Sequence, residues 1–425
     1  MFAKILLLEV NIRLKNIIFH IDVNSAFLSW EAVYRLAHKG SRQDLREIAS
    51  AVGGDITRRR GIILAKSIPA KSYGIKTGET IMEARRKCPG LVLVPPDYSL
   101  YQKCSDALME ILREYSDVVE QYSIDEAFVD MSAGCRLFGT PENVAARIRD
   151  RIREELGFTV NVGISCNKLL AKMASDFAGP DRVHTLYPGE IREKMWPLPV
   201  SDLFFAGKAT TGRLLSMGIR TIGELAEADP AWIKSVLKKQ GEILWGFANG
   251  IDFSPVLGEP AANKGYGNST TTPYDVTDEE TAKQVLLSLS ETVGRRLRAD
   301  GVEAGLVSVG IRYADMAYVS HQKVLAVPTN LTWEIYEAGC RLFGELWNGR
   351  PLRHMGVHTG RVNGESFVRQ MSIFDEIDYE KLMRMDKAVD GIRRRFGADA
   401  VMRAVFLNNS ISHMSGGIEN VMKLH

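Results

Sequence analysis

The sequence has no long hydrophobic run. Near its start, a short apolar run is interrupted by Glu9 and is followed by no small-residue cleavage site. Such a run is too short for a membrane span or a secretory signal. No later segment approaches the roughly 20 apolar residues of a spanning helix. We therefore expect a soluble, cytoplasmic protein that does not enter a membrane.

Cysteine is scarce, and strong net charge is absent. The five cysteines are widely spread and form no CxxC pair, which argues against a disulfide framework or a zinc site and fits a reducing compartment. His354 and His358 lie four apart, but no third ligand accompanies them. The net charge of +2 does not by itself indicate a polyanionic partner.

The chain is too long for one hydrophobic core. Its 425 residues predict about two to four domains, and a composition of 45% hydrophobic and 25% charged residues is typical of globular proteins. Between residues 31 and 90, Lys and Arg outnumber Asp and Glu, with a run at Arg58–Arg60. A charge run is usually a solvated face, so this excess only slightly favours a polyanionic partner.

Hydrophobic periodicity divides the chain into three parts. Strands predicted at residues 17–23, 122–131 and 158–165 alternate with helices up to about residue 185, which indicates an α/β or α+β unit. Two short amphipathic helices are expected within residues 203–229. After a linker rich in Pro, Gly and Ala, alternating strands and helices predict a second α+β domain that ends near Val362.

Acidic residues lie at the ends of two predicted strands. Asp125 and Glu126 stand side by side within YSIDEAFVDM, and Asp22 ends the apolar run IIFHI. One of two adjacent carboxylates on a strand should face the core, where an unpaired charge is costly. If the strands are neighbours, the three carboxylates could hold two divalent cations; alternatively, they are ordinary surface turn residues. Asp130 is expected to be structural.

Basic residues could balance a triphosphate near these acids. Lys71 lies in SIPAKSYGIKTGE, and Lys168 begins a predicted helix after GISCN. Lysine ammonium groups suit phosphate oxygens, and the helix start at Asn167 offers backbone donors. Either lysine alone is more often a solvent-facing residue.

The motifs IDVNSAF, SIPAKSYGIKTGETIMEARRKCP, YSIDEAFVDMS and GISCNKLLAKMASDFAGPD occur in this order. They resemble the successive motifs of Y-family translesion DNA polymerases of the bacterial polymerase IV and V (ImpB/MucB/SamB) type. The resemblance implies an α+β multidomain, right-hand polymerase fold with a ferredoxin-like palm. The implied parts are a palm (16–25 and 97–185), fingers (26–96), a helical thumb (186–257), a linker (258–265), an α+β little finger (266–362) and a tail (363–425).

The same resemblance assigns roles to single residues. It implies that Asp22, Asp125 and Glu126, with the backbone carbonyl of Val23, bind two Mg²⁺ ions. Phe27 falls at the position of a steric gate against the ribose 2′-hydroxyl. Lys71 and Lys168 match triphosphate-binding positions. Four positions depart from the common pattern: Asn24, Ile68, Lys71 and Gly179.

Two further motifs point to macromolecular partners. Residues 203–229 resemble a helix–hairpin–helix, in which Gly207 and Lys208 would contact a DNA phosphate, although one glycine stands where two are usual. Gln370, Ile373 and Phe374 are similar to the short motif by which bacterial polymerases bind the sliding clamp. We expect a monomer that acts on primer–template DNA and dNTPs.

The function predicted from these motifs is template-directed DNA synthesis past damaged bases, without proofreading, as part of the DNA damage (SOS) response. Two alternatives remain open. One is a catalytically silent DNA-binding homologue. The other is a nucleotidyl cyclase, which Gly53-Gly54-Asp55 weakly suggests, although a cyclase needs neither a helical hairpin nor a clamp motif.

Overall fold

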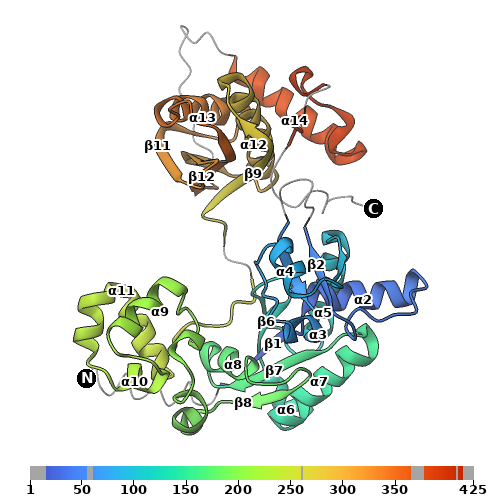
Figure 1. The fold of residues 1–425 in the computed structure, drawn as a ribbon, viewed down its shortest axis with the longest axis vertical. Helices are drawn as coiled ribbons and strands as arrows, with labels where there is room; N and C mark the ends of the chain where they lie inside the picture. The colour runs from blue at the N-terminus through green and yellow to red at the C-terminus, as the bar shows by residue number, and fades with distance from the viewer. Residues whose placement is uncertain (1–15, 55–60, 260–261, 365–377, 408–409, 415–425) are drawn as a thin grey trace. The chain divides into compact units, whose positions relative to one another are not determined.

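The structure is a computed structural model that describes residues 16–54, 61–259, 262–364, 378–407 and 410–414. The chain forms two compact units (Figure 1): Met1–Gly53 with Ile63–Ala261, and Ala262–His425 with Gly54–Ile62. Each unit has its own hydrophobic core. Within the described ranges, no helix combines the length and apolar character that crossing a membrane would demand.

A five-stranded sheet in the order β5-β6-β1-β7-β8 lies at the centre of the first unit. In the register of the antiparallel strands β1 and β6, Asp22 lies opposite Glu126, and β1 also pairs antiparallel with β7. The strands are β1 (Ile18–Val23), β5 (Val119–Gln121), β6 (Glu126–Asp130), β7 (Val160–Ser165) and β8 (Val183–Thr185).

The two faces of this sheet bury different groups. Phe19 and Ile21 of β1 share a core with α5 (Tyr98–Arg113) and α7 (Pro141–Leu156). Ile18, on the alternate face of the strand, packs against α8 (Lys168–Ser175). Asp22 has the same parity as Ile18, so its side chain points toward the α8 face. A short helix, α6 (Gly134–Phe138), precedes α7.

Gly163 of β7 allows α8 to lie directly on the sheet. A Cβ atom at this position would come within 2.0 Å of the carbonyl oxygen of Ala171 and 2.4 Å of the amide nitrogen of Ser175. Because both of these are helix backbone atoms, any larger residue would push α8 away. The glycine therefore sets how close the side chains of α8 come to Asp22 and Glu126.

A small mixed sheet with the order β3-β2-β4 and three helices follow β1. The strand β2 was not predicted, because its four residues, SAVG, lack a clear period. Gly53 ends this strand, whereas Asp55 lies outside the described residues. The elements are α2 (Ala26–His38), β2 (Ser50–Gly53), β3 (Ile63–Lys66), α3 (Ile68–Ser72), α4 (Ile81–Lys87) and β4 (Val92–Val94).

The predicted helical region forms a compact bundle in the first unit. Its core includes Leu169 and Leu170 of α8, so the bundle packs on the palm-like sheet through that helix. The elements are η1 (Pro188–Glu190), η2 (Ile191–Met195), η3 (Val200–Asp202), α9 (Lys208–Ser216), α10 (Ile222–Glu227) and α11 (Pro230–Ala248).

The second unit contains a four-stranded antiparallel sheet in the order β11-β10-β12-β9. Strand β9 begins at Gly265, inside the predicted linker, and contains Pro273, which an edge strand tolerates. The core joins the sheet to α12 and α13. The elements are β9 (Gly265–Val276), α12 (Glu279–Ala299), β10 (Glu303–Tyr313), β11 (Tyr318–Thr329), α13 (Thr332–Leu346) and β12 (Leu352–Asn363).

The one helix expected in the tail is α14 (Tyr379–Phe396), and two short turns follow it, η4 (Ala398–Ala400) and η5 (Ala404–Phe406). This helix docks on the second unit through buried ions. Arg298 of α12 pairs with Asp386 at 3.0 Å and with Asp390 at 2.6 Å. Asp386 also accepts a hydrogen bond from the amide nitrogen of Thr332, at the start of α13.

Replacement of Asp386 by alanine should destabilise the protein. The change leaves the amide of Thr332 without its acceptor, and it leaves Asp390 as the remaining carboxylate partner of the buried Arg298 guanidinium, which should lower the free energy of unfolding by about 1–3 kcal/mol. Urea unfolding of the full chain measures the loss. The control is Glu380→Ala on the exposed side of the same helix, and a loss no larger than the control's would contradict the docking energetics.

Candidate active site

The structure brings Asp22 and Glu126 together on the α8 face of the sheet. Their Cα atoms are partners across β1 and β6. The ammonium of Lys172, on α8, lies 3.1 Å from Oδ2 of Asp22 and 3.2 Å from Oε2 of Glu126. Two carboxylates from different strands thus share one positive charge, which is the convergence that the sequence predicted for Asp22 and Glu126.

Asp125 lies outside strand β6, which begins at Glu126. Its carbonyl oxygen accepts a hydrogen bond from the amide of Val23 at 3.1 Å, and its carboxylate accepts one from the hydroxyl of Ser123 at 2.6 Å. The strand therefore turns between the two acidic residues, and neither carboxylate is forced into the apolar core. This resolves the conflict that two adjacent acids pose within one strand.

A cavity of about 580 Å³ opens beside these acids. Asp22, Val23 and Asp125 line it, whereas Glu126 is not among the lining residues. Its other walls come from α2, β3, α3 and the segment after α8. They include Asn24, Ser25, Phe27, Lys66, Ile68, Lys71, Thr77, Asp176 and Gly179. The cavity therefore combines carboxylates, lysines and an aromatic ring.

Burial and neighbouring charges shift the pKa values of Asp22 and Glu126 in opposite directions. Burial raises the pKa of Asp22 to about 7, despite the nearby charge of Lys172. Burial also acts to raise the pKa of Glu126, but the hydrogen bond from His20 and the charge of Lys172 outweigh it and lower that pKa to about 2. Burial disfavours the charged form of Lys172, whereas Asp22, Asp176 and Glu126 together raise its pKa.

The donor set fits hard divalent cations. Carboxylate oxygens are the ligands that Mg²⁺ prefers, and Lys172 already occupies the region where Asp22 and Glu126 attract a cation. Oδ1 of Asp22 and Oε1 of Glu126 accept no hydrogen bond from the described residues. No three His, Cys, Asp or Glu side chains converge into a ready-made metal cluster within those residues. Asp125 is instead a third carboxylate at the cavity wall.

Phe27 lies on the cavity wall at the start of α2. Its ring stacks on Tyr101 with centroids 4.4 Å apart and an interplanar angle of 9°, and Tyr98 meets it edge-on. The preceding turn places Ser25 at a φ of 50°, a left-handed conformation that is uncommon for serine. The turn and the aromatic stack together fix the Phe27 ring between the end of β1 and α5.

The predicted lysines occupy different environments. Lys71 lines the cavity, as does Lys66, which the motif comparison did not single out. Lys168 does not line it: its ammonium lies 2.6 Å from Oε1 of Glu120. The start of α8 is also capped, because Leu169 donates its amide to Asp252. A triphosphate role for Lys168 therefore remains a prediction, and it would require a rearrangement of these contacts.

The thumb and tail motifs are placed as follows. Gly207 is the N-cap of α9, Lys208 is its first residue, and both are exposed. The described residues show only a helix start there, so DNA contact remains a prediction. The segment from Gln370 to Phe374 lies outside the described residues, and its proposed partner is equally untested.

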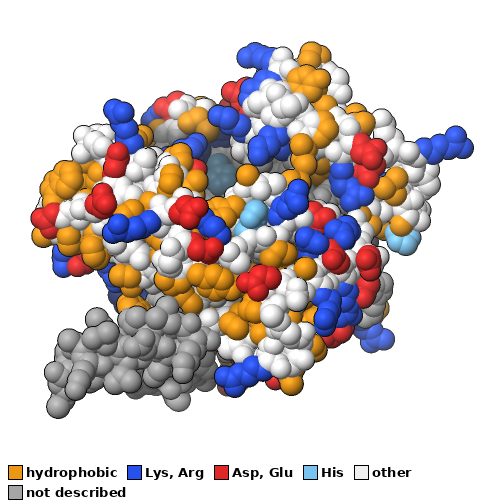
Figure 2. Space-filling view, turned by 90° about the horizontal axis from the view of Figure 1, so that it is seen from below, with side chains coloured by type: hydrophobic (Ala, Val, Ile, Leu, Met, Phe, Trp, Pro, Cys, Tyr) orange, Lys and Arg blue, Asp and Glu red, His pale blue; other side chains and the backbone are white. Residues whose placement is uncertain are grey.

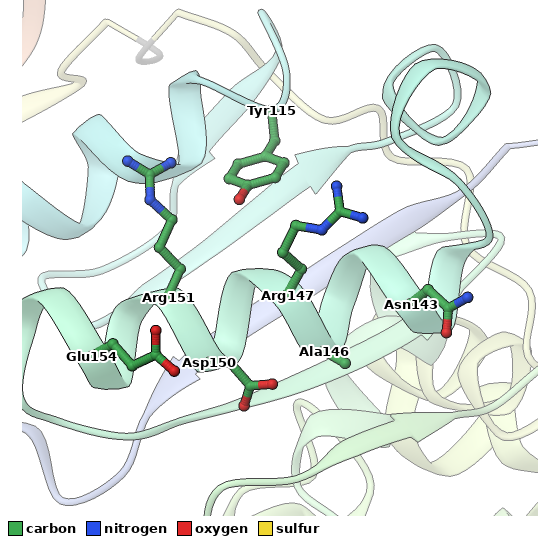
Figure 3. Close-up of a pocket in the computed structure, with 7 residues that line it drawn as sticks. All are labelled: Tyr115, Asn143, Ala146, Arg147, Asp150, Arg151 and Glu154. Carbon is green, nitrogen blue, oxygen red and sulfur yellow. The ribbon is translucent and has the colours of Figure 1, made fainter.

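A second cavity, about 740 Å³, lies against α7 and is larger but chemically less suited (Figure 3). Tyr115 forms part of its wall, and Arg151 is tied to Glu114 at 2.6 Å. Asp150 is likewise paired with Arg149 and Arg153. Because these charged side chains already pair with one another, they leave little charge available to a ligand. The face seen in Figure 2 likewise mixes acidic and basic side chains.

Comparisons with known proteins agree with this geometry. Models of the impB/mucB/samB family and of its C-terminal domain match residues 21–176 and 263–373. A protein named DNA polymerase IV from Clostridium acetobutylicum is 43% identical over 93% of this chain and 99% of its own length. The chain belongs to the impB/mucB/samB family.

Other relatives of this family member extend over similar lengths. DNA polymerase IV from Acetivibrio thermocellus is 38% identical over 93% of this chain and 98% of its own length. DNA polymerase IV 2 from Bacillus subtilis is 39% identical over 92% of this chain and 95% of its own length. A solved Y-family DNA polymerase chimera of Dbh and Dpo4 covers 81% of this chain and 99% of its own, with a TM-score of 0.70 and 22% identity. The predicted right-hand polymerase fold is therefore confirmed.

Two departures of this family member from the common motif have structural roles. The side-chain oxygen of Asn24 accepts a hydrogen bond from the amide of Asp181 at 2.9 Å, which fixes the loop beside the cavity. Gly179 has a φ of +100° and supplies a carbonyl oxygen to the side-chain amide of Asn161 at 3.0 Å.

Three residues at or beside the cavity were not predicted from the sequence: Lys172, His20 and Lys66. The position of Lys172 could have indicated it, because it lies one helical turn after Lys168 and so on the same helix face.

The raised pKa of Asp22 predicts that cation binding depends on pH. Below pH 7 the Asp22 carboxyl of the metal-free protein carries a proton that a cation must displace. The apparent affinity for Mn²⁺ should therefore fall about tenfold from pH 8 to pH 6. Isothermal titration calorimetry at both values measures it, and equal affinities would contradict the assigned pKa.

Proposed function

We propose that this family member is a template-directed DNA polymerase of the translesion class, which transfers a nucleotide from a dNTP to a primer 3′-hydroxyl without proofreading. The observation that carries the proposal is the pairing of Asp22 with Glu126 across β1 and β6, next to a cavity that Asp22 and Asp125 line together with two lysines. The names of the relatives and the polymerase fold support the same reaction.

The acidic residues define where the reaction would occur. Asp22, Asp125 and Glu126, with the carbonyl of Val23, would hold two Mg²⁺ ions, which supply Lewis-acid stabilisation of the attacking and leaving oxygens. The residues of the chain fix this geometry: the β1–β6 register sets two carboxylates opposite each other. The hydrogen bond between Val23 and the carbonyl of Asp125 sets the third.

The remaining walls would orient the nucleotide. Lys66 and Lys71 lie on β3 and α3 and carry positive charge toward a triphosphate, as point charges rather than planar forks. The Phe27 ring, backed by Tyr101, would occupy the space of a ribose 2′-hydroxyl. The two lysines would thus recognise the triphosphate, and the Phe27 ring would discriminate against a ribose sugar.

The division into hand-like parts is also proposed. The proposed parts are a palm (16–25 and 97–185), fingers (26–96), a thumb (186–257) and a little finger (266–362). The main buried clusters follow this division only in outline, because Trp30 of α2 packs in the core of the central sheet and Leu170 of α8 packs in the core of the helical bundle. Gly207 and Lys208 would meet a DNA phosphate in the thumb. The tail segment Gln370–Phe374 would bind a sliding clamp, and the monomeric state is likewise a proposal.

The alternatives receive no specific support. A nucleotidyl cyclase would need the Gly-Gly-Asp sequence beside its catalytic acids, yet Gly53, where β2 ends before its antiparallel partner β3, does not line the acidic cavity. A silent DNA-binding homologue would have no need for the three acids, which are all present. Primer extension with and without template distinguishes these candidate functions. Cyclic product without template would favour a cyclase, and no extension under either condition would favour a silent homologue.

Removal of single acids should abolish synthesis without loss of DNA binding. Asp125→Asn and Glu126→Gln should each lower primer extension by at least about a thousandfold, because a neutral amide holds cations poorly. DNA affinity, measured by fluorescence anisotropy, should stay within about threefold. Asp130→Asn is the control, since its oxygen can still accept the amide of Ser132. Retained extension in both variants would refute the site.

Replacement of Phe27 by alanine should admit ribonucleotides. The smaller side chain opens the space beside the sugar, so discrimination between dNTP and rNTP should fall by on the order of tenfold to a hundredfold. Single-nucleotide kcat/KM values measure this ratio. Phe27→Tyr keeps the ring and should retain discrimination, whereas an unchanged ratio in the alanine variant would exclude Phe27 as the gate.

A further inference from the structure

Lys172 is the buried cation nearest the proposed metal site. It lies in the middle of α8 and is only 7% exposed. Its ammonium contacts Oδ2 of Asp22 at 3.1 Å, Oε2 of Glu126 at 3.2 Å and Oδ1 of Asp176 at 3.3 Å. One lysine therefore contacts three carboxylates, those of Asp22 on β1, Glu126 on β6 and Asp176 at the C-cap of its own helix.

The position of Lys172 depends on long-range packing. Gly163 lets α8 approach β7 within backbone contact, and β7 lies beside β1, which carries Asp22. His20 also contacts Oε2 of Glu126 at 3.2 Å, while its other ring nitrogen meets Ser175 of α8 at 2.7 Å. Two groups held by the α8 face thus engage the same oxygen of Glu126.

These contacts leave one oxygen of each strand carboxylate available. Among the described residues, Oδ1 of Asp22 and Oε1 of Glu126 accept no hydrogen bond. Like charges directly opposite each other on paired strands are destabilising, so the two carboxylates need a positive partner when no metal is bound. The third partner of Lys172 is Asp176, which is half exposed and lines the cavity. The ammonium can therefore keep a carboxylate partner at Asp176 if cations draw Asp22 and Glu126 away from it.

We propose that Lys172 is the resident counter-ion of the metal-free centre. It holds the carboxylates of Asp22 and Glu126 together until divalent cations bind, and it shares these carboxylates with the cations. This role rests on the proposed metal-binding function of the acids. Lys172 is thus a positioning residue that tunes cation affinity and makes the folded state independent of bound metal.

Lys172→Met tests the proposal through stability and cation binding. Without the ammonium, the opposed carboxylates repel, so Tm in EDTA should fall by on the order of 5 °C. Saturating Mn²⁺ should restore most of this loss, because the cation supplies the missing charge. By linkage, Mn²⁺ should bind the variant at least about threefold more tightly than the wild type. Thermal unfolding and calorimetry measure both effects.

Matched variants separate the possible failures. Lys172→Arg keeps the charge and should retain a Tm response to Mn²⁺ close to that of the wild type. An equal loss of Tm for Lys172→Met in EDTA and in Mn²⁺, or weaker Mn²⁺ binding, would overturn the counter-ion role and indicate a purely structural lysine. Should Lys172→Met not fold, Lys172→Gln provides the same comparison with a shorter polar side chain.

The proposed metal function is tested in parallel by Asp22→Asn. This variant should lose the Mn²⁺-dependent rise in Tm, both alone and combined with Lys172→Met. A full Mn²⁺ response in Asp22→Asn would refute the metal site itself. Loss of the response in Asp22→Asn, with no greater response in Lys172→Met, would refute only the role of Lys172.

Discussion

The register between β1 and β6 is the constraint on which the rest of the site depends. It sets Asp22 directly opposite Glu126, so two carboxylates face each other on one side of a buried sheet. Like charges in this arrangement repel, and burial adds a desolvation cost. The fold retains them because Lys172 of α8 and His20 of β1 both contact Oε2 of Glu126 on this face of the sheet.

Much of the first unit can be understood as support for this pair. The other face of β1 is fully apolar and packs against α5 and α7, which fixes the strand. The turn after β1 brings Phe27 against Tyr101, so this aromatic part of the cavity wall follows directly on the strand that carries Asp22. A rigid sheet thus carries the charged groups, while α2, β3 and α3 close the cavity around them.

The sequence predicts features with a local signature and misses those that depend on distant segments. The strand of Asp22, the acidic pair and the helix α9 follow from periodicity and motif. Lys172 could not be assigned, because its partners lie on β1 and β6 far along the chain and its approach requires Gly163. The capping of α8 by Asp252 depends on a segment 83 residues away.

In the second unit, too, the features that the sequence did not predict depend on contacts between distant segments. Strand β9 follows a Gly- and Pro-containing stretch that reads as linker, and only its pairing with β12 makes it a strand. Tail helix α14 was predicted, but its docking was not, because charged residues such as Asp386 and Arg393 normally indicate a solvated face. Here they are buried against Arg298 and Glu291.

The proposed function requires that Asp22, Asp125 and Glu126 form one cation-binding centre. An anomalous difference map from crystals of the protein grown with Mn²⁺, DNA and an incoming nucleotide tests it most directly. We expect manganese peaks within coordination distance of all three carboxylates. Manganese bound elsewhere, with Asp22 and Glu126 still contacted by Lys172 and His20, would contradict it.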